Sequence, residues 1–370
     1  MAESPRLLFS LSEREVKVFR GSLRSLNKVG AELMICATPN EVQFITISKT
    51  QTAHLALTCS ADFFGNYAIF GCILLQAVVP IKNVLAPFRS QKIENITFEL
   101  PVDECRLIVT VDCENGLVKK YTFPVIDREV SVMGEIESLP VRVIVEPASM
   151  IKYLSTFHHR VEEVALIAHP QETGGGGGGG GTNSCGAPTV EFKSYIDPNK
   201  SQIDDSLHAM ISIYNTLPFA SYSNSLDSVV EIIFNIKDFK AMLTLSEMIG
   251  TNIELSFNEP SQPLVVVSHF LDGYGGYVKA RLVVSTIDNP YSAAYQEEQE
   301  PGAVRNGAAG PPLLPGRQQQ QPREEIQLED NYGYHVGDDE EDGGIANTPP
   351  EDMEVLPSAF PGLISAPSRF

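Results

Sequence analysis

The sequence predicts an α+β fold of many short antiparallel strands and few helices, arranged as two similar halves. Three observations predict it. Short apolar or alternating runs follow one another through the first 290 residues, as half-buried strands do. Helical patterns interrupt that series at two equivalent places in each half, so the same order of elements occurs twice. The composition then changes near residue 290, where a polar, acidic segment begins.

The predicted strands form two series that match in order. In the first half the runs are 6–10, 32–38, 41–48, 53–58, 72–79, 93–100, 105–113 and 117–125. In the second half they are 141–145, 161–169, 189–195, 207–214, 229–235, 251–257, 264–270 and 277–284. Tight turns at Asn40 and at Asp103 and Glu104 favour antiparallel pairing of neighbouring strands.

Helices are predicted at residues 12–28, 81–89, 147–157 and 238–248. The first has a clear start, because Ser12 is a good N-cap and Glu15 completes a capping box. We expect the second helix to be short, since Pro87 removes a backbone hydrogen bond and bends the chain. Each half then reads strand, helix, three strands, strand, helix and three strands. This order contains four copies of one helix-plus-sheet unit.

The first helix carries a basic stripe that is unusual in so acidic a chain. The sequence has 27 Lys and Arg against 47 Asp and Glu, a net charge of −20. The stripe spans about 120° of the helix at about 100° per residue, and it consists of Arg14, Lys17, Arg20, Arg24 and Lys28. Either it is an ordinary solvated helix face, or it binds a polyanion.

The other helices carry weaker versions of this stripe. In the second helix Lys82 and Arg89 lie about 20° apart. Lys152 opposes the apolar side of the third helix, and Arg160 lies just beyond that helix. In the fourth helix Lys237 and Lys240 share a face, which Glu247 also joins. The repetition favours contacts to phosphates, which would depend on salt and be indifferent to base sequence.

The remaining segments give the domain organisation. A charged stretch at 126–139 suits a connector between a domain at 1–125 and a domain at 140–290. The second domain contains an eight-glycine run at 174–181, which is too flexible to be a strand or helix. Residues 291–370 hold 15 acidic and 4 basic residues together with 10 Pro and 9 Gly. This composition predicts a disordered acidic tail.

The six cysteines are expected to be free thiols. Cys36, Cys59 and Cys72 lie in apolar runs, and no C-x-x-C pair occurs among Cys36, Cys59, Cys72, Cys105, Cys113 and Cys185. The chain has no apolar run long enough to span a membrane, and its first residues do not resemble a signal peptide. We expect no membrane association, no cofactor and no metal site.

Several strings resemble the sliding-clamp family, and more closely the Rad-nine-type subunits of the heterotrimeric DNA-damage checkpoint clamp, the nine-one-one complex. They are "FRGSLRSLNKVGAELMICAT", "SADFFGNYAI", "LAPFRS", "FNIKDFKAMLTLSEMIGTNIELSFNEPSQPLVVV" and "LDGYGGYVKARLVVST". They occur in the family's order within residues 6–290, and a long polar tail is also a family trait. The string at 48–52 departs from the family pattern, and the tail is short with few Ser and Thr residues.

The resemblance implies a non-enzymatic nuclear clamp subunit that encircles duplex DNA at damage sites. Sheets would form the wall of a ring, and helices would line its hole. The implied DNA-facing residues are Arg14, Lys17, Arg20, Arg24, Lys28, Lys82, Arg89, Lys152, Arg160, Lys237 and Lys240. Hus-one-type and Rad-one-type subunits would complete the ring through edge strands at 117–125 and 207–214. The implied interface residues are Leu117, Lys119, Tyr121, Phe123, Leu207, Ala209, Ile211 and Ile213.

The resemblance also implies that the tail is phosphorylated and then recruits a BRCT-repeat checkpoint mediator. Thr348 in "NTPPEDMEV" is the best candidate, followed by Ser358 and Ser365. Apolar residues near the C-terminus suggest a docking segment for the checkpoint clamp loader or for the ring itself; they include Val355, Leu356 and Phe360.

Two alternative functions stay open from the sequence. One is a 3′–5′ exonuclease within the same clamp, which would need carboxylates that converge on a metal ion. The acids at Asp103, Glu104, Asp112 and Glu114 are the candidates, although acids are ordinary at predicted turns. The other is a homotrimeric replication clamp, against which the acidic tail and the unlike edge strands argue.

Overall fold

The computed structural model describes residues 4–90, 92–126, 138–170, 189–196, 210–213, 219–271, 276–289 and 355–356, and the even-numbered residues from 128 to 136. These residues belong to one compact unit. The glycine run at 174–181, Cys185, Leu207, Ala209 and the three predicted phosphorylation sites lie outside the described residues.

The described elements form two series of nine strands and two helices each. The first series is β1 (Arg6–Ser12), α1 (Glu13–Val29), β2 (Glu32–Ala37), β3 (Glu41–Ile47), β4 (Ala53–Ser60), β5 (Asn66–Phe70), β6 (Leu75–Pro80), α2 (Ile81–Leu85), β7 (Ile93–Pro101), β8 (Arg106–Cys113) and β9 (Val118–Pro124). The second is β10 (Val141–Val145), α3 (Pro147–Leu154), β11 (Glu163–Ala168), β12 (Val190–Tyr195), β13 (Met210–Ile213), β14 (Phe219–Asn224), β15 (Val230–Asn235), α4 (Ile236–Ile249), β16 (Ile253–Phe257), β17 (Leu264–Leu271) and β18 (Tyr277–Val284). A short strand, β19 (Val355–Leu356), follows.

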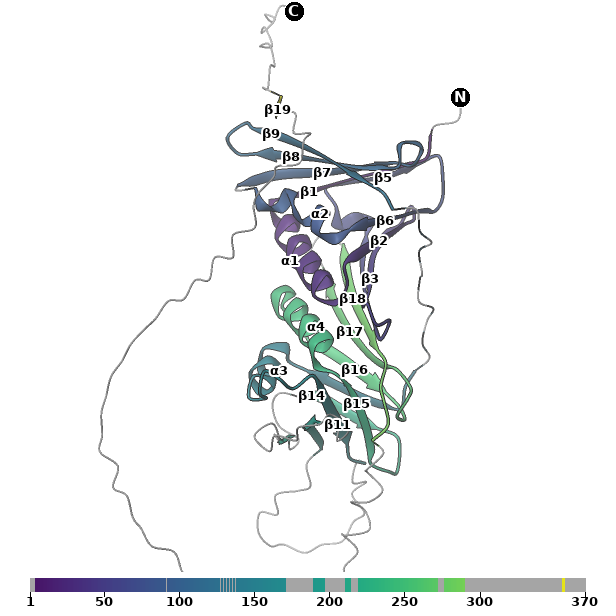
Figure 1. Ribbon diagram of the computed structural model, residues 1–370, viewed down its shortest axis with the longest axis vertical. Coiled ribbons are helices and arrows are strands. Elements are labelled where there is room, and N and C mark those ends of the chain that lie inside the picture. Colours follow the sequence, from purple (N-terminus) through teal and green to yellow (C-terminus); the bar gives the residue numbers. More distant parts are fainter. Residues whose placement is uncertain are drawn as a thin grey trace, which may run out of the picture. The chain divides into compact units, whose positions relative to one another are not determined.

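The strands make three sheets in which all described pairs are antiparallel, as predicted. One sheet has the order β19-β9-β8-β7-β1-β5, and another has the order β13-β12-β11-β15. Between them a nine-stranded sheet of order β14-β10-β16-β17-β18-β4-β3-β2-β6 contains strands from both halves (Figure 1). The two halves are therefore joined by direct pairing of β18 with β4.

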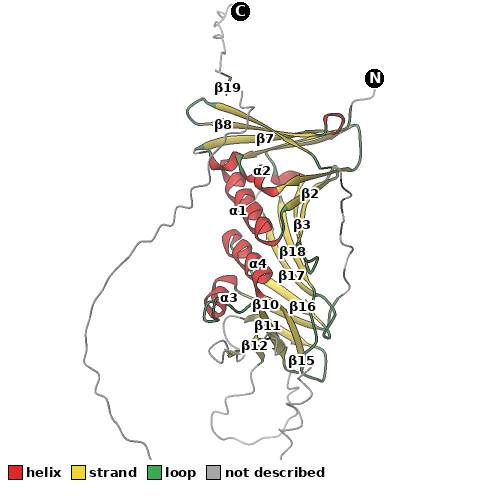
Figure 2. Ribbon diagram, in the orientation of Figure 1, coloured by secondary structure: helices red, strands yellow, loops and turns green. Residues whose placement is uncertain are grey.

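The α-helices gather on one side of the nine-stranded sheet (Figure 2). α1 contacts strands of two sheets, and α4 packs on β17 and β18. The backbone N–H of Ser12 donates to Glu15 Oε2 at 2.9 Å, so the predicted capping box forms at the start of α1. The second helix is short, as Pro87 predicts: α2 ends at Leu85, and a 3₁₀ turn covers Pro87–Arg89.

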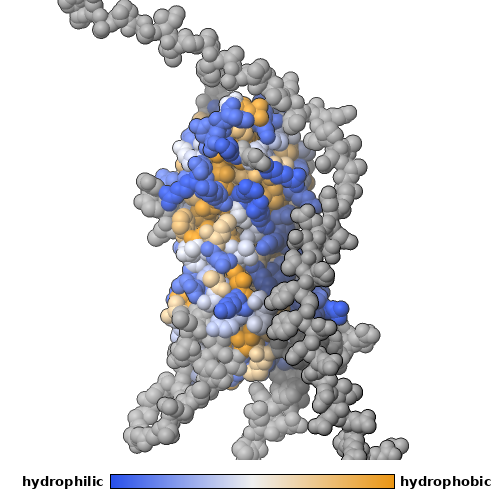
Figure 3. Space-filling model, turned by 90° about the vertical axis from the view of Figure 1, so that its left-hand side faces the viewer, coloured by the Kyte–Doolittle hydropathy of each residue, from blue (hydrophilic) through white to orange (hydrophobic). Residues whose placement is uncertain are grey.

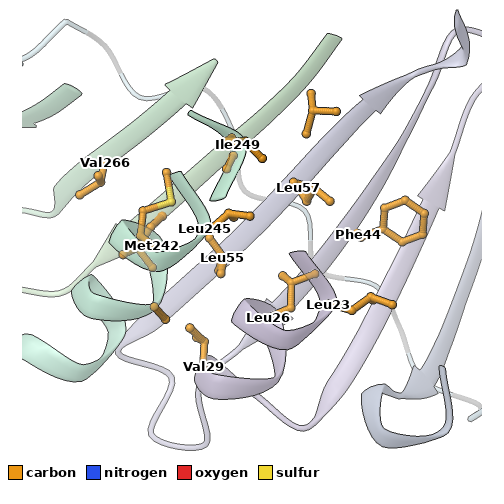
Figure 4. Close-up of a cluster of buried hydrophobic side chains, with 14 of the residues drawn as sticks. Leu23, Leu26, Val29, Phe44, Leu55, Leu57, Met242, Leu245, Ile249 and Val266 are labelled. Atoms are coloured by element: carbon orange, nitrogen blue, oxygen red, sulfur yellow. The ribbon is translucent and has the colours of Figure 1, made fainter. Parts of the chain in front are cut away.

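The hydrophobic core fills the space between the helices and the sheets. Figure 4 shows how α1 and α4 contribute to one cluster over β3, β4 and β17: Leu23, Leu26, Val29, Phe44, Leu55, Leu57, Met242, Leu245, Ile249 and Val266. In the first half, aromatic rings tie α1 to two sheets. Phe19 lies 4.9 Å from Phe44 and 5.9 Å from Phe98 between ring centroids. Burial of these large side chains fixes which face of α1 is left for solvent.

Two predictions about local structure need correction. Strands β5 and β14 have no counterpart among the predicted runs, so five strands, not four, separate the two helices in each half. β5 has four half-buried residues in succession and no apolar alternation, and β14 has the polar sequence FASYSN. Cys72 lies before β6, where its thiol is half-buried, and not inside a strand. The described cysteines are free thiols.

Candidate nucleic-acid and subunit interfaces

The four α-helices form one contiguous row. α2 contacts α1, α1 contacts α4, and α4 contacts α3. This order places the helices of the first half beside those of the second. Every predicted DNA-facing residue lies on this row or on the turns that end its helices. The residues predicted separately from four sequence segments therefore belong to one side of the molecule.

α1 presents its basic stripe to solvent. Arg14, Lys17, Arg24 and Lys28 are exposed, and Arg20 is half-buried. The opposite side of the helix is buried, including Phe19, Leu23 and Leu26. Lys17 Nζ lies 3.3 Å from Glu13 Oε1, both groups being well exposed. An exposed pair of this kind contributes little to stability and competes weakly with other anions.

The other helices add basic side chains unevenly. Lys82, Arg89, Lys152, Arg160 and Lys237 are exposed. Lys240 is half-buried, and this burial lowers the pKa of its ammonium group. Glu247 is exposed on the same helix. The positive charge of this surface is therefore concentrated on α1.

Figure 3 faces the side that carries the helices. Hydrophilic side chains gather over its upper part, where α1 lies in Figure 1, and hydrophobic ones lie beside them. Two apolar side chains exposed on the helix row were not predicted from sequence: Tyr153 and Met248, which are 36% and 44% exposed. Met248 covers Gly21 of α1, where a Cβ would lie 1.7 Å from its sulfur. Gly21 thus allows α1 and α4 to approach closely.

Two strands, β9 and β13, lie at sheet edges in places where the corresponding strands of the other half are paired. β18 is the ninth strand of its half and pairs with β4, the fourth strand of the other. The ninth strand of the first half is β9, and the fourth strand of the second half is β13; these two do not pair with each other. β13 ends its sheet, and β9 is followed only by the two-residue strand β19. Of the predicted interface residues in and next to β9, Leu117, Tyr121 and Phe123 are half-buried and pack against the core.

The direction of the open backbone groups on β9 follows from two hydrogen bonds. Cys113 N donates to Leu117 O, and Val125 N donates to Cys105 O, each at 3.0 Å. Antiparallel strands alternate between residues that bond to one neighbour and residues that bond to the other. Odd-numbered residues of β9 therefore bond to β8, and the N–H and C=O groups of Val118, Lys120 and Thr122 point to the open edge.

Three of the four carboxylates that are candidates for an exonuclease site have a neighbouring partner. Glu104 lies 3.0 Å from Arg106, and Glu114 lies 3.3 Å from Lys92. Asp112 accepts a hydrogen bond from Asn95 at 3.3 Å. Within the described residues, no group of three or more His, Cys, Asp or Glu side chains could hold a metal ion. In the same part of the chain, no helix has the length and apolar character needed to cross a bilayer.

A polar groove not predicted from sequence lies under the connector. Two cavities of about 350 and 280 Å³ share Lys279 and Arg281, and connector residues Ile136 and Val132 help to line them. Arg281 Nη2 donates to Gly134 O at 3.0 Å and holds the connector against β18. The sequence offers no signal for this groove, because its residues come from separate strands and from alternate connector positions.

Comparisons with known proteins agree with this geometry. The Rad9 family model matches residues 19–287. A "Cell cycle checkpoint control protein Rad9" of Drosophila melanogaster is 22% identical over 294 residues, which are 78% of this chain and 58% of the fly protein. The chain thus spans little more than half the length of that relative.

Three solved structures have the same fold at low sequence identity. The PCNA2–PCNA3 complex of Sulfolobus tokodaii gives a TM-score of 0.55 at 13% identity and covers 75% of this chain and 98% of its own. PCNA of Thermococcus kodakaraensis gives 0.53 at 13%, covering 76% and 99%. Proliferating Cellular Nuclear Antigen of Entamoeba histolytica gives 0.55 at 10%, covering 78% and 100%. The chain has the sliding-clamp fold, and it belongs to the Rad9 family.

Proposed function

We propose that this chain is a non-enzymatic subunit of a heterotrimeric checkpoint clamp that encircles duplex DNA at damage sites in the nucleus. The observation that carries the proposal is the row of four helices, whose outward side chains include the basic stripe of α1. In a chain of net charge −20, this surface suits a polyanion better than the rest of the molecule does. The sliding-clamp fold and the name of the fly relative support the same reading.

Contacts made by this surface would be to phosphates. Exposed Lys and Arg side chains on helices reach phosphate oxygens without reading base edges. Each neutralised phosphate releases counterions, so binding should weaken steeply as salt rises. A clamp that slides needs this kind of contact, because its grip must be the same at every base pair.

Ring closure would use the two edge strands. β9 and β13 would each add a strand of another subunit, in the way that β4 adds to β18 within this chain. β9 and β13 differ in length and sequence, which favours two different partners, of the Hus-one and Rad-one types. The clamp domains would be residues 1–125 and 140–290, joined by the connector at 126–139.

The acidic tail at 291–370 would serve signalling. Phosphorylation at Thr348, Ser358 or Ser365 would add acceptor oxygens that a basic pocket of a BRCT-repeat mediator could bind. The checkpoint clamp loader would open the ring and place it on DNA. These roles come from the family resemblance, and the sequence around Thr348 supports them.

The proposal is tested by reversing charge on α1. The double variant Arg20→Glu, Arg24→Glu should assemble with both partner subunits, since the two side chains lie away from the sheet edges. The assembled ring should be retained on DNA at least about tenfold less, because two phosphate contacts become repulsive. The measurement is size determination of the co-purified complex, followed by DNA retention over a range of salt concentrations.

A matched control is Lys92→Glu, Arg106→Glu. Both side chains are exposed and pair with surface acids at the sheet of β7 and β8, so this double change alters net charge equally, away from the helix row. It should leave retention within about twofold of the native ring. Equal loss in both variants would mean that net charge alone governs binding. A stable homotrimer, or a chain indifferent to the two partners, would refute the heterotrimer.

A further inference from the structure

The C-terminal segment places a strand on the open edge of β9. β19 runs antiparallel to β9, with Val355 opposite Lys119 and Leu356 opposite Val118. The sheet therefore continues past the last strand of the first half into residues more than 200 positions further along the chain (Figure 1).

The internal duplication allows that position to be compared with an established pairing. Ile126, just after β9, bridges Val78 of β6, and Ile287, just after β18, bridges Ile233 of β15. If the two bridges are equivalent, Val118 corresponds to Lys279, because each lies eight residues before its bridge residue. The side chains agree with this match, since Leu117 and Val278 both pack on the core.

β19 then takes on β9 the place that β4 takes on β18. Lys279 is paired with Thr58 and Ala280 with Leu57. At the corresponding positions, Val118 is paired with Leu356 and Lys119 with Val355. The direction of the added strand is the same in both cases, because both pairs are antiparallel.

The hydrogen-bond alternation gives independent agreement. Ser285 N donates to Thr52 O at 2.8 Å, so odd-numbered residues of β18, including Lys279, bond to β4. On β9 the backbone groups of even-numbered residues, including Val118, point to the open edge. Val118 and Leu356 therefore hold the same bonding position as Lys279 and Thr58. The segment uses the register that strand addition uses elsewhere in this fold.

We infer that the C-terminal segment around Val355 and Leu356 pairs in cis with β9 and covers one end of the edge that another clamp subunit would use. The other clamp subunit, with which this segment would compete for β9, is part of the proposed function, whereas the pairing of the segment with β9 does not depend on that proposal. An uncovered edge strand invites unwanted strand addition. A segment of the same chain would cover it at high effective concentration and leave when a longer strand pairs along β9.

The test is hydrogen exchange in the full chain without any partner. The amide of Val118 should be protected, whereas those of Lys120 and Thr122, which β19 does not reach, should exchange freely. The variant Leu356→Pro removes the donor to Val118 and should speed exchange at Val118 about tenfold, the change expected from losing about 1.4 kcal/mol of pairing. Exchange at Tyr121, which bonds to β8, should not change.

The matched control is Ile345→Pro, which places the same residue in the same acidic tail outside the pairing segment. It should leave the rate at Val118 unchanged. Protection that is independent of protein concentration supports pairing in cis, and protection that grows with concentration overturns it. Equal rates at Val118, Lys120 and Thr122 in the native chain would also overturn it. None of these outcomes depends on ring assembly, so they leave the proposed function to its own test.

A second experiment measures whether the C-terminal segment competes with the partner subunit for β9. The subunit that pairs with β9 should associate faster with Leu356→Pro than with the native chain or with Ile345→Pro. Equal association rates, together with protection of Val118 in the free chain, would retain the pairing and overturn its role as a competitor.

Discussion

At the scale of single residues, close packing between elements sets which positions tolerate change. Gly30 ends α1 and donates its backbone N–H to Leu26 O at 3.0 Å. A Cβ at this position would lie 2.2 Å from Thr46 Oγ1 and 2.4 Å from the backbone oxygen of Ile47. Because one of these atoms belongs to the backbone of β3, the neighbour cannot simply rotate away.

Gly30→Ala should therefore destabilise the chain by about 1–3 kcal/mol, the usual cost of overpacking. The matched control is Gly65→Ala, where the nearest atom to a Cβ is Ser10 Oγ at 3.5 Å, an ordinary contact. That variant should stay within about 0.5 kcal/mol of the native chain. Denaturant unfolding of the three proteins measures the difference, and equal stability of the two variants would contradict the packing argument.

Tyr277 links the two halves through a charge-assisted hydrogen bond. Its hydroxyl donates to Glu41 Oε2 at 2.6 Å, and this bond, together with burial, raises the pKa of Tyr277 to about 12 from 10.0. A raised folded-state pKa contributes stability that is complete below the unfolded value and is lost as pH rises through the folded value. The contribution should thus be present up to pH 10 and disappear towards pH 12.

Tyr277→Phe should cost about 1 kcal/mol at pH 8, since the bond is partly exposed to solvent. Unfolding free energies of the native chain and the variant, measured from pH 8 upwards, should converge between pH 10 and 12. A difference that stays constant over that range would show that the lost stability comes from packing and not from the hydrogen bond.

At the scale of elements, the duplication explains both what the sequence predicts and what it does not. α1 is predictable because its capping box, apolar face and basic stripe are all local. The fifth strand of each half, β5 and β14, is missed both times, since neither has an apolar alternation of its own. Tertiary pairing forms these strands: β5 lies against β1, and β14 lies against β10.

The candidate site likewise has one part that local sequence predicts and another part that forms only through tertiary contacts. The helical repeat predicts which basic residues share one face of each helix. Whether the four helices form one row depends on the contact between α1 and α4, which belong to different halves. Gly21 under Met248 is part of that meeting and has no local signature. The groove at Lys279 and Arg281 is likewise formed by strands and a connector that are distant in sequence.

An element-scale prediction concerns the open edge of β9. Thr122→Pro removes an N–H that points to that edge, so the chain should fold normally and lose the partner that adds there. Tyr121→Pro removes an N–H that bonds to β8 and should destabilise the chain itself. Thermal unfolding and co-purification with the partner subunits distinguish the two. Full partner binding by a folded Thr122→Pro variant would exclude β9 as an assembly edge.

At the scale of the whole molecule, charge is divided between surfaces. The chain is strongly acidic, yet the helix row keeps basic side chains together. In a closed ring those helices would face the DNA, and the remaining negative charge would face outward, where it would discourage non-specific DNA contacts. In the proposed ring, the edges at β9 and β13 would be the ones that pair with the neighbouring subunits.

The most direct test of the central claim is topological. The chain, assembled with its two partner subunits and placed by the clamp loader on nicked circular DNA, is measured for retention before and after the circle is cut. A ring that encircles DNA without base contacts should stay on the circle and slide off the linear product at moderate salt. Equal retention on circular and linear DNA would show surface binding and would contradict the account.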